Sequence, residues 1–209
     1  METIQYLKSI YPAGTPIFLK DIRIGRKSKS AIRQELYRAA KRGEILRKYD
    51  GVYYFKEDAS SSGLVLYEDV LEQKYIHGPT FIEGFDIDVY GYYDGLTAAN
   101  MLGFTPQHPF VFEVCTNRTS SKKRTICLGG HRAILQKSRV EVNRQNWRIL
   151  QFFGALKALS PEEIEENRTK IKNYIDKWFD KTLFDQFSPS ASAEVMKVLE
   201  EENLIKEFR

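Results

Sequence analysis

The sequence predicts an α+β fold, and three observations lead to this class. Apolar residues recur at helical spacing in several segments, and short runs rich in β-branched and aromatic residues lie between those segments. An Asp-Gly pair separates two of these runs and is typical of a β-hairpin turn. The chain has 209 residues, with 42% hydrophobic and 29% charged residues. This composition indicates a folded chain of one large or two small domains.

The first helices are predicted before residue 30. Residues 1–10 carry apolar side chains at helical spacing, and a Pro12-Ala13-Gly14 turn follows them. Thr15 and Pro16 then resemble the cap and first position of a short second helix. The apolar face of that helix would consist of Phe18, Leu19 and Ile22.

A third helix and a hairpin complete the first region. The helix is expected from about Ser30 to Arg42, with Gly43 at its end. Its buried stripe would consist of Ile32, Leu36, Ala39 and Ala40. Strands are expected at Glu44–Tyr49 and Val52–Phe55. This order predicts a winged helix-turn-helix domain over residues 1–58, followed by a linker over residues 59–75 with Ser60–Gly63 as its joint.

Residues 76–209 are predicted to form a second, mixed α+β domain that ends in helices. Strands are expected at Phe110–Cys115 and Arg124–Leu128. A capping signature at Ser160 predicts the start of a long helix. The expected helices cover Gly95–Leu102, a segment from Asn143 or Arg144 to Leu159, a segment from Pro161 to about Lys181, and Ala191–Glu202.

The positive charge of the chain is concentrated in its first region. Residues 1–58 hold 13 Lys/Arg against 7 Asp/Glu, whereas residues 59–140 hold 8 against 8 and residues 141–209 hold 11 against 13. Residues 20–48 alone contain 11 basic and 3 acidic side chains. Because binding to nucleic-acid phosphates depends on such local concentration, the first domain is predicted to bind double-stranded DNA.

The third helix supplies the side chains that we expect to meet base edges. Arg33 matches the two acceptors of guanine and Gln34 matches adenine, whereas cations at the turn and on the wing match phosphates. A solvated helix face and a protein-binding winged helix are the alternatives. The predicted DNA-binding set is Arg23, Arg26, Lys27, Ser28, Lys29, Ser30, Arg33, Gln34, Tyr37, Arg38, Lys41, Arg47 and Lys48.

Motifs for other classes of function are incomplete in the sequence. Asp86-x-Asp88 has no Gly-Ser phosphate loop before it, and Glu113-Val114-Cys115 has no lysine where a metal-dependent nuclease needs one. We therefore expect a binding protein with no catalytic residues, no cofactor and no metal site, although a DNA-processing enzyme remains an alternative. The absence of a long apolar run and of a signal peptide predicts a cytoplasmic protein with no membrane partner. Its two cysteines should then be thiols.

From Tyr90 onward the sequence resembles the AbiEi-type antitoxins of bacterial abortive-infection systems. The resemblance rests on Gly95–Asn100, Leu102–Thr105 and Leu135–Arg139, and in the first domain on Lys41–Ile45 and Gly51–Tyr53. It implies a type IV antitoxin that represses its own operon and counteracts a nucleotidyltransferase toxin, with direct contact left open. The alternative is a transcription factor whose second domain senses a ligand or oligomerises.

A second basic surface is predicted around the Thr119–Ser121 turn. Because strands are expected on both sides, this turn would be the tip of a hairpin that meets phosphate, nucleotide or an acidic protein surface. A solubilising loop is the alternative. The predicted partner surface consists of Arg118, Lys122, Lys123, Arg124, Lys137 and Arg139.

Overall fold

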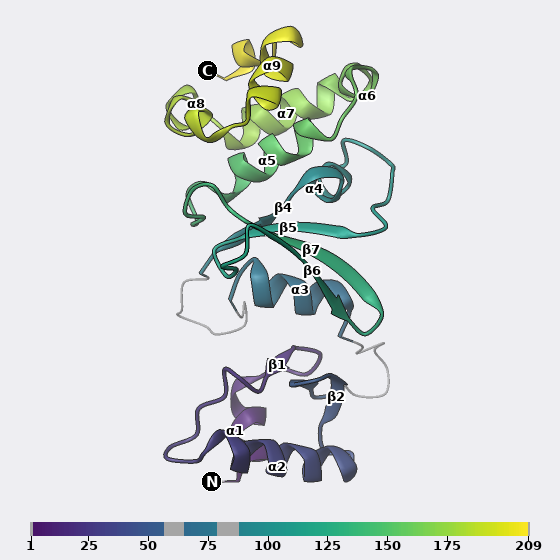
Figure 1. The fold of residues 1–209 in the computed structure, drawn as a ribbon, viewed down its shortest axis with the longest axis vertical. Coiled ribbons are helices and arrows are strands. Elements are labelled where there is room, and N and C mark those ends of the chain that lie inside the picture. Colours follow the sequence, from purple (N-terminus) through teal and green to yellow (C-terminus); the bar gives the residue numbers. More distant parts are fainter. Residues whose placement is uncertain (1, 57–64, 79–87, 209) are drawn as a thin grey trace. The chain divides into compact units, whose positions relative to one another are not determined.

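The computed structural model describes residues 2–56, 65–78 and 88–208 (Figure 1). The chain divides into two compact units. The first comprises Met1–Lys74 with Gly78–Ile87 and Leu128–Gly130, and the second comprises the remaining segments. Helices and strands both occur throughout, so the predicted α+β class is confirmed. The expected joint at Ser60–Gly63 lies outside the described residues.

The first unit begins with two helices and a small antiparallel sheet. Helix α1 spans Thr3–Ile10 and helix α2 spans Lys29–Lys41. Strands β2 (Leu46–Tyr49) and β3 (Val52–Tyr54) form the expected hairpin, and the sheet order is β1-β3-β2. The hairpin was predicted from Asp50-Gly51, and Gly51 has the left-handed φ of 70° that this turn requires.

Helix α2 is confirmed. It begins at Lys29, one residue before the expected start at Ser30. The Ser28 side chain caps the helix by accepting a hydrogen bond from the Ala31 N–H at 3.2 Å. At the other end Gly43 has a φ of 74°, and the Glu44 N–H donates to the Ala39 carbonyl at 3.0 Å. This is the Schellman pattern that glycine favours after a helix.

The predicted second helix is wrong. Ile17 and Phe18 form strand β1, which pairs with β3, and the chain then turns through Leu19–Asp21. The Leu19 N–H donates to the Gly51 carbonyl at 2.9 Å, so the hairpin, rather than a helix, satisfies this backbone group. The first unit therefore lacks the middle helix of the expected helix-turn-helix outline.

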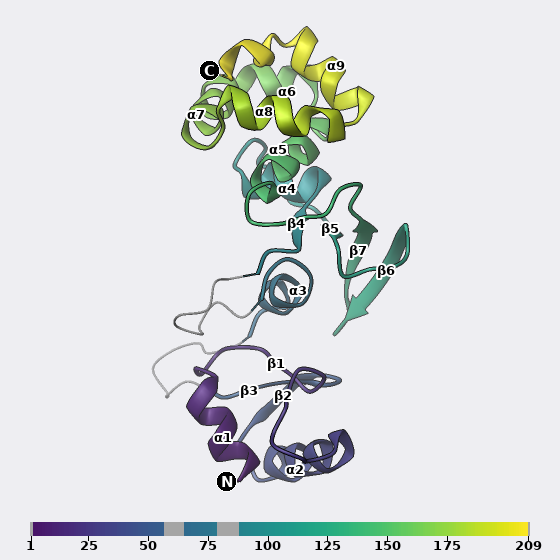
Figure 2. The ribbon, with the colours of Figure 1, turned by 90° about the vertical axis from the view of Figure 1, so that its left-hand side faces the viewer.

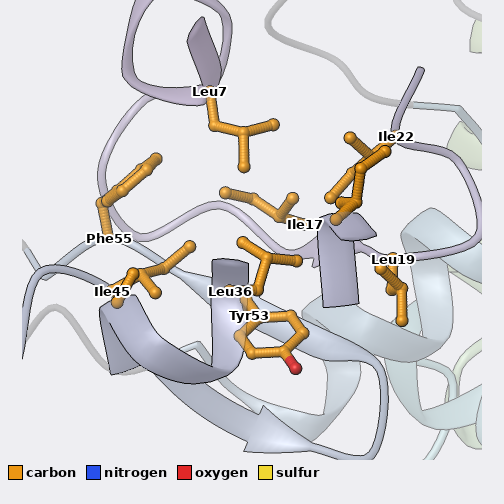
Figure 3. Packing of buried hydrophobic residues seen from close by; sticks show 10 residues of the cluster. Leu7, Ile17, Leu19, Ile22, Leu36, Ile45, Tyr53 and Phe55 are labelled. Carbon is orange, nitrogen blue, oxygen red and sulfur yellow. The ribbon is translucent and has the colours of Figure 1, made fainter. Parts of the chain in front are cut away.

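The core of the first unit contains at least one apolar residue from each of α1, β1, α2 and β3. Leu7 of α1, Ile17 of β1, Leu36 of α2 and Tyr53 of β3 point toward one another (Figure 3), and each is at most 4% exposed. Ile45 lies in the same cluster and is 1% exposed. Packing on this core fixes which face of α2 remains outside.

Part of the predicted linker is a helix. Residues Tyr67–Tyr75 form α3, and Val70 packs with Phe18 and Val52 of the small sheet. The buried Gln73 side chain donates from Nε2 to the Pro16 carbonyl at 2.9 Å. The prediction of a linker over 59–75 is therefore wrong for its second half, because this segment buries apolar side chains against the first unit.

The second unit contains a four-stranded mixed sheet. Its strands are β4 (Gly91–Tyr93), β5 (Phe112–Thr116), β6 (Lys123–Leu128) and β7 (His131–Lys137), in the order β4-β5-β7-β6. Strand β7 lies parallel to β5 and separates it from β6. The expected β5–β6 hairpin is therefore wrong, and the Thr119–Ser121 turn is not a hairpin tip.

Helices cover one face of this sheet and extend away from it. Helix α5 (Trp147–Lys157) lies between the sheet and the C-terminal helices, beside α4 (Gly95–Met101) (Figures 1 and 2). The C-terminal helices are α6 (Pro161–Glu166), α7 (Arg168–Trp178), α8 (Lys181–Phe187) and α9 (Ala193–Glu201), with short 3-10 turns at Ser188–Ser190 and Leu204–Glu207. Among the described residues, no helix combines the length and the hydropathy needed to span a bilayer.

The capping signature at Ser160 is confirmed, but the single long helix is wrong. Ser160 and Glu163 form a reciprocal capping box at the start of α6. The helix then breaks at Asn167, where the Asn167 side-chain amide donates to the Glu163 carbonyl at 2.9 Å. An asparagine side chain that competes in this way for a backbone acceptor disfavours helix continuation.

Candidate nucleic-acid interface

The outward face of α2 carries the side chains that the sequence assigned to base recognition. Ile32, Leu36 and Ala39 are buried, so the opposite positions are turned to solvent. Arg33 and Gln34 are exposed, as are Ser30, Tyr37, Arg38 and Lys41. Burial of one helical stripe thus leaves a row of hydrogen-bonding groups on the surface.

Part of this row meets the hairpin in a common hollow. Arg33, Gln34 and Tyr37 from α2 line a cavity of about 280 Å³. Arg47, on β2, and Asp50, in the hairpin turn, contribute to the same cavity. The predicted recognition helix and wing are therefore brought together on one surface of the first unit, which we call the α2–hairpin surface.

The α2–hairpin surface continues toward the start of α2. A neighbouring cavity of about 370 Å³ is lined by Lys20, Lys29 and Arg33, among others. The Lys29 ammonium donates to the Leu19 carbonyl at 3.2 Å and to the Lys20 carbonyl. The predicted DNA-binding set does not include Lys20. Its place in the basic run of residues 20–48 is the sequence feature that could have identified it.

The other flank of α2 has mixed charge. The Lys27 ammonium lies 2.8 Å from the Glu35 carboxylate, which also accepts a hydrogen bond from Thr3. These two hydrogen bonds, the one from Lys27 first, lower the pKa of Glu35, so its carboxylate is ionised at neutral pH. Lys27, predicted to contact phosphate, is thus paired within the protein.

Arg38 belongs to the same flank. It lines a cavity together with Glu2, Glu35, Arg42 and Glu44. Arg42 and Glu44 form an ion pair at 2.6 Å. The charges on this side largely offset one another, so the predicted DNA-binding residues divide between a basic surface and a mixed one.

The remaining predicted DNA-binding residues are positioned by local contacts. Arg23 donates to the Lys20 and Ile22 carbonyls at 2.8 and 3.1 Å. Lys41 lies over the Tyr37 ring at 4.8 Å, and Lys48 lies over the Tyr49 ring at 5.7 Å. Three further observations complete the set: Arg47 forms an ion pair with Asp50, Arg26 is exposed in the preceding turn, and Ser28 caps α2.

No family model, curated protein or solved structure matches the chain. In its described part, no group of three or more His, Cys, Asp or Glu side chains is arranged to hold a metal ion.

The residues of the predicted partner surface make different local contacts in the structure. Arg118 stacks on the Tyr90 ring, with its guanidinium carbon 3.4 Å from the ring centroid. Lys123 and Arg124 are exposed on β6, the edge strand of the sheet. Lys122 lies next to Lys137, since the Lys137 N–H donates to the Lys122 carbonyl at 3.2 Å. Lys137 and Arg139 line a separate cavity.

The two cysteines of the second unit should differ sharply in reactivity. Burial, and then the charge of Asp94, raises the pKa of the Cys115 thiol, which donates to Asp94 Oδ2 at 3.3 Å. Cys127 is exposed. Because the thiolate is the nucleophile, we expect iodoacetamide to label Cys127 alone in the native protein and both cysteines in denaturant. Peptide mass spectrometry checks this, and rapid native labelling of Cys115 would contradict the raised pKa.

The Lys27–Glu35 pair gives a prediction for nucleic-acid binding. Glu35→Gln removes the negative charge that holds Lys27, so Lys27 should become able to neutralise a phosphate. We expect duplex binding to tighten and the slope of log affinity against log salt to steepen by at most about 0.9. Fluorescence anisotropy at several salt concentrations measures both quantities. Lys27→Ala in the wild-type background should have little effect, and a large loss of affinity would show that Lys27 already contacts DNA.

Proposed function

We propose that the chain is a DNA-binding transcriptional repressor that uses α2 as its recognition helix. The observation that carries this proposal is the α2–hairpin surface, where Arg33, Gln34 and Arg47 share one hollow. An α-helix fits the major groove of B-form DNA, where arginine pairs with guanine and glutamine with adenine. Arg33 has no acidic partner among the described residues, so its guanidinium is available for such a pair.

The hairpin and the turn before α2 supply the phosphate contacts that fix the orientation of the protein on the duplex. Arg47 and Lys48 are assigned to the neighbouring phosphate backbone or minor groove. Arg26 and the N–H groups at the start of α2 are assigned to phosphates, because the N-terminus of a helix attracts anions. In this arrangement phosphate contacts set the register and α2 reads the sequence.

The second part of the proposal is that the protein acts as an antitoxin against a nucleotidyltransferase toxin and represses its own operon. It is supported by the resemblance of both regions of the sequence to the AbiEi-type antitoxins. We assign antitoxicity to the second unit, and we propose that the protein has no catalytic activity of its own.

A promoter-binding experiment tests the repressor proposal. The full chain is titrated with its own promoter duplex and with a scrambled duplex at several salt concentrations. Neutralisation of about six phosphates would give a log–log slope near −5. Equal affinity for the two duplexes, or a slope near zero, would exclude sequence-specific binding through a basic surface.

The antitoxin proposal is tested separately by co-expression with the neighbouring gene product. The full chain and its Arg33→Ala variant are each produced with that protein, and bacterial growth is measured. Rescue of growth by both chains supports an antitoxin function that does not require DNA binding. If neither chain rescues growth, the antitoxin function is excluded for that partner while the promoter experiment stands.

A transcription factor that senses a small ligand is the second candidate. It is favoured by a cavity in the second unit, which has both polar and apolar walls and lies far along the chain from α2. The chemistry of that cavity does not depend on how the first unit binds DNA.

A further inference from the structure

A cavity of about 140 Å³ lies in the second unit, where the end of β7, the end of α5 and the start of α9 meet. Its walls include apolar side chains from α5 and α9, among them Phe153 and Val195. Its polar lining comes from segments far apart in the sequence. The cavity is thus a product of the tertiary fold and belongs to no single motif.

Positive charge predominates in this cavity. Lys137 ends β7, Arg139 follows that strand, and Lys157 ends α5. The carboxylate among the lining residues is Asp94, which accepts the Cys115 thiol hydrogen at 3.3 Å. Lys157 also lies 3.3 Å from Glu194, whose side chain is 71% exposed. Three cations against Asp94 and Glu194 leave a surplus of one positive charge, which favours an anion.

Hydrogen-bond donors add to this charge. Helix α9 begins at the cavity wall, and Ser192 caps it by accepting from the Val195 N–H at 3.3 Å. The other N–H groups of the first turn have no acceptor within the helix, and this end of a helix attracts anions. Ser138 also lines the wall, between Lys137 and Arg139.

We infer that this cavity binds the phosphate group of a small anion. The volume of 140 Å³ equals the liquid volume of four to five water molecules at about 30 Å³ each. Pockets that enclose whole drug-sized ligands are larger, about 300 to 1,000 Å³. A phosphate fits the space, and its oxygens match the lysine, arginine and backbone donors around it. This inference is independent of the proposed DNA binding.

Titration of the full chain with inorganic phosphate tests the inference, with chloride used to hold the ionic strength constant. Isothermal titration calorimetry is expected to show one saturable site per chain with a Kd below about 1 mM. A parallel titration with glycerol phosphate identifies the source of the phosphate group. Tighter binding of the ester indicates a phosphorylated metabolite, and tighter binding of the inorganic ion indicates free phosphate.

Two variants locate the site. Arg139→Ala removes one exposed guanidinium and is expected to weaken phosphate binding about tenfold. Ala191→Leu fills the cavity without changing its charge, and its extended backbone accommodates leucine, so binding should be lost while the fold is kept. Circular dichroism confirms the fold of each variant.

Two matched controls separate this site from other cations. Lys206→Ala removes an exposed lysine elsewhere in the second unit, and Arg33→Ala alters the α2–hairpin surface. Both should bind phosphate as the wild type does. The inference is overturned if no saturable binding occurs, if Arg139→Ala and Ala191→Leu bind normally, or if either control loses binding equally.

Discussion

Replacing Arg33 with alanine is expected to weaken binding to the promoter duplex by about 10- to 100-fold, the range for loss of one bidentate arginine–guanine contact. Arg33 lines both hollows of the α2–hairpin surface, so it is the cation that α2 places most centrally there. Affinity for a scrambled duplex should fall much less, because that binding depends on phosphates. Electrophoretic mobility shift or anisotropy titrations with both duplexes measure the difference.

The matched control is Arg38→Ala on the opposite flank of the same helix. Arg38 lies among Glu2, Glu35 and Glu44, so its loss removes a charge that is already offset. We expect a change below about threefold. If Arg38→Ala weakens promoter binding more than Arg33→Ala does, the mixed flank faces the duplex and the proposed orientation of α2 is wrong.

Phe152→Ala is expected to destabilise the second unit by about 3–5 kcal/mol, the usual range for removal of a buried phenylalanine. Phe152 is 0% exposed, and its ring centroid lies 5.3 Å from that of Phe179 and 6.0 Å from that of Tyr174. It also contacts the rings of Phe104, Phe153 and Phe208. The cavity left by alanine would therefore separate α5 from the helices packed on it.

Urea unfolding followed by tryptophan fluorescence measures this loss. Both tryptophans, Trp147 and Trp178, belong to the second unit, so the signal reports that unit. Phe110→Ala serves as the control, because Phe110 is 89% exposed and its removal should change stability little. A loss below about 1 kcal/mol for Phe152→Ala would contradict the packing described for α5.

Elements with strong local signals were predicted correctly. Helix α2 has an apolar stripe at the helical period, a serine cap and a terminal glycine, all within sixteen residues of sequence, Ser28–Gly43. The β2–β3 hairpin has its Asp-Gly turn, and the start of α6, although not its end, is marked by the capping box at Ser160. In each case the interactions that form the element join residues close in sequence, so the pattern alone predicts it.

Elements that depend on distant partners were predicted wrongly. The residues around Ile17 and Phe18 have apolar side chains at helical spacing. These two residues nevertheless pair with β3, which lies more than thirty residues later in the sequence. Strand β7 enters the sheet between β5 and β6 because Ala133 and Leu135, both 0% exposed, need a central position. Most of the β6 side chains are exposed, which suits an edge strand. Local pattern does not specify such strand order.

Charge content and helical period are properties of local sequence, so they are enough to predict that cations concentrate in residues 20–48 and that Arg33 and Gln34 lie opposite the buried stripe of α2. Which cations lie on the same surface depends on how the chain packs in three dimensions. Lys27 pairs with Glu35 and Thr3, Arg33 and Arg47 line one cavity, and Arg139 and Lys157 line another. Electrostatic interactions depend on distance in space, and the packing of the core sets these distances.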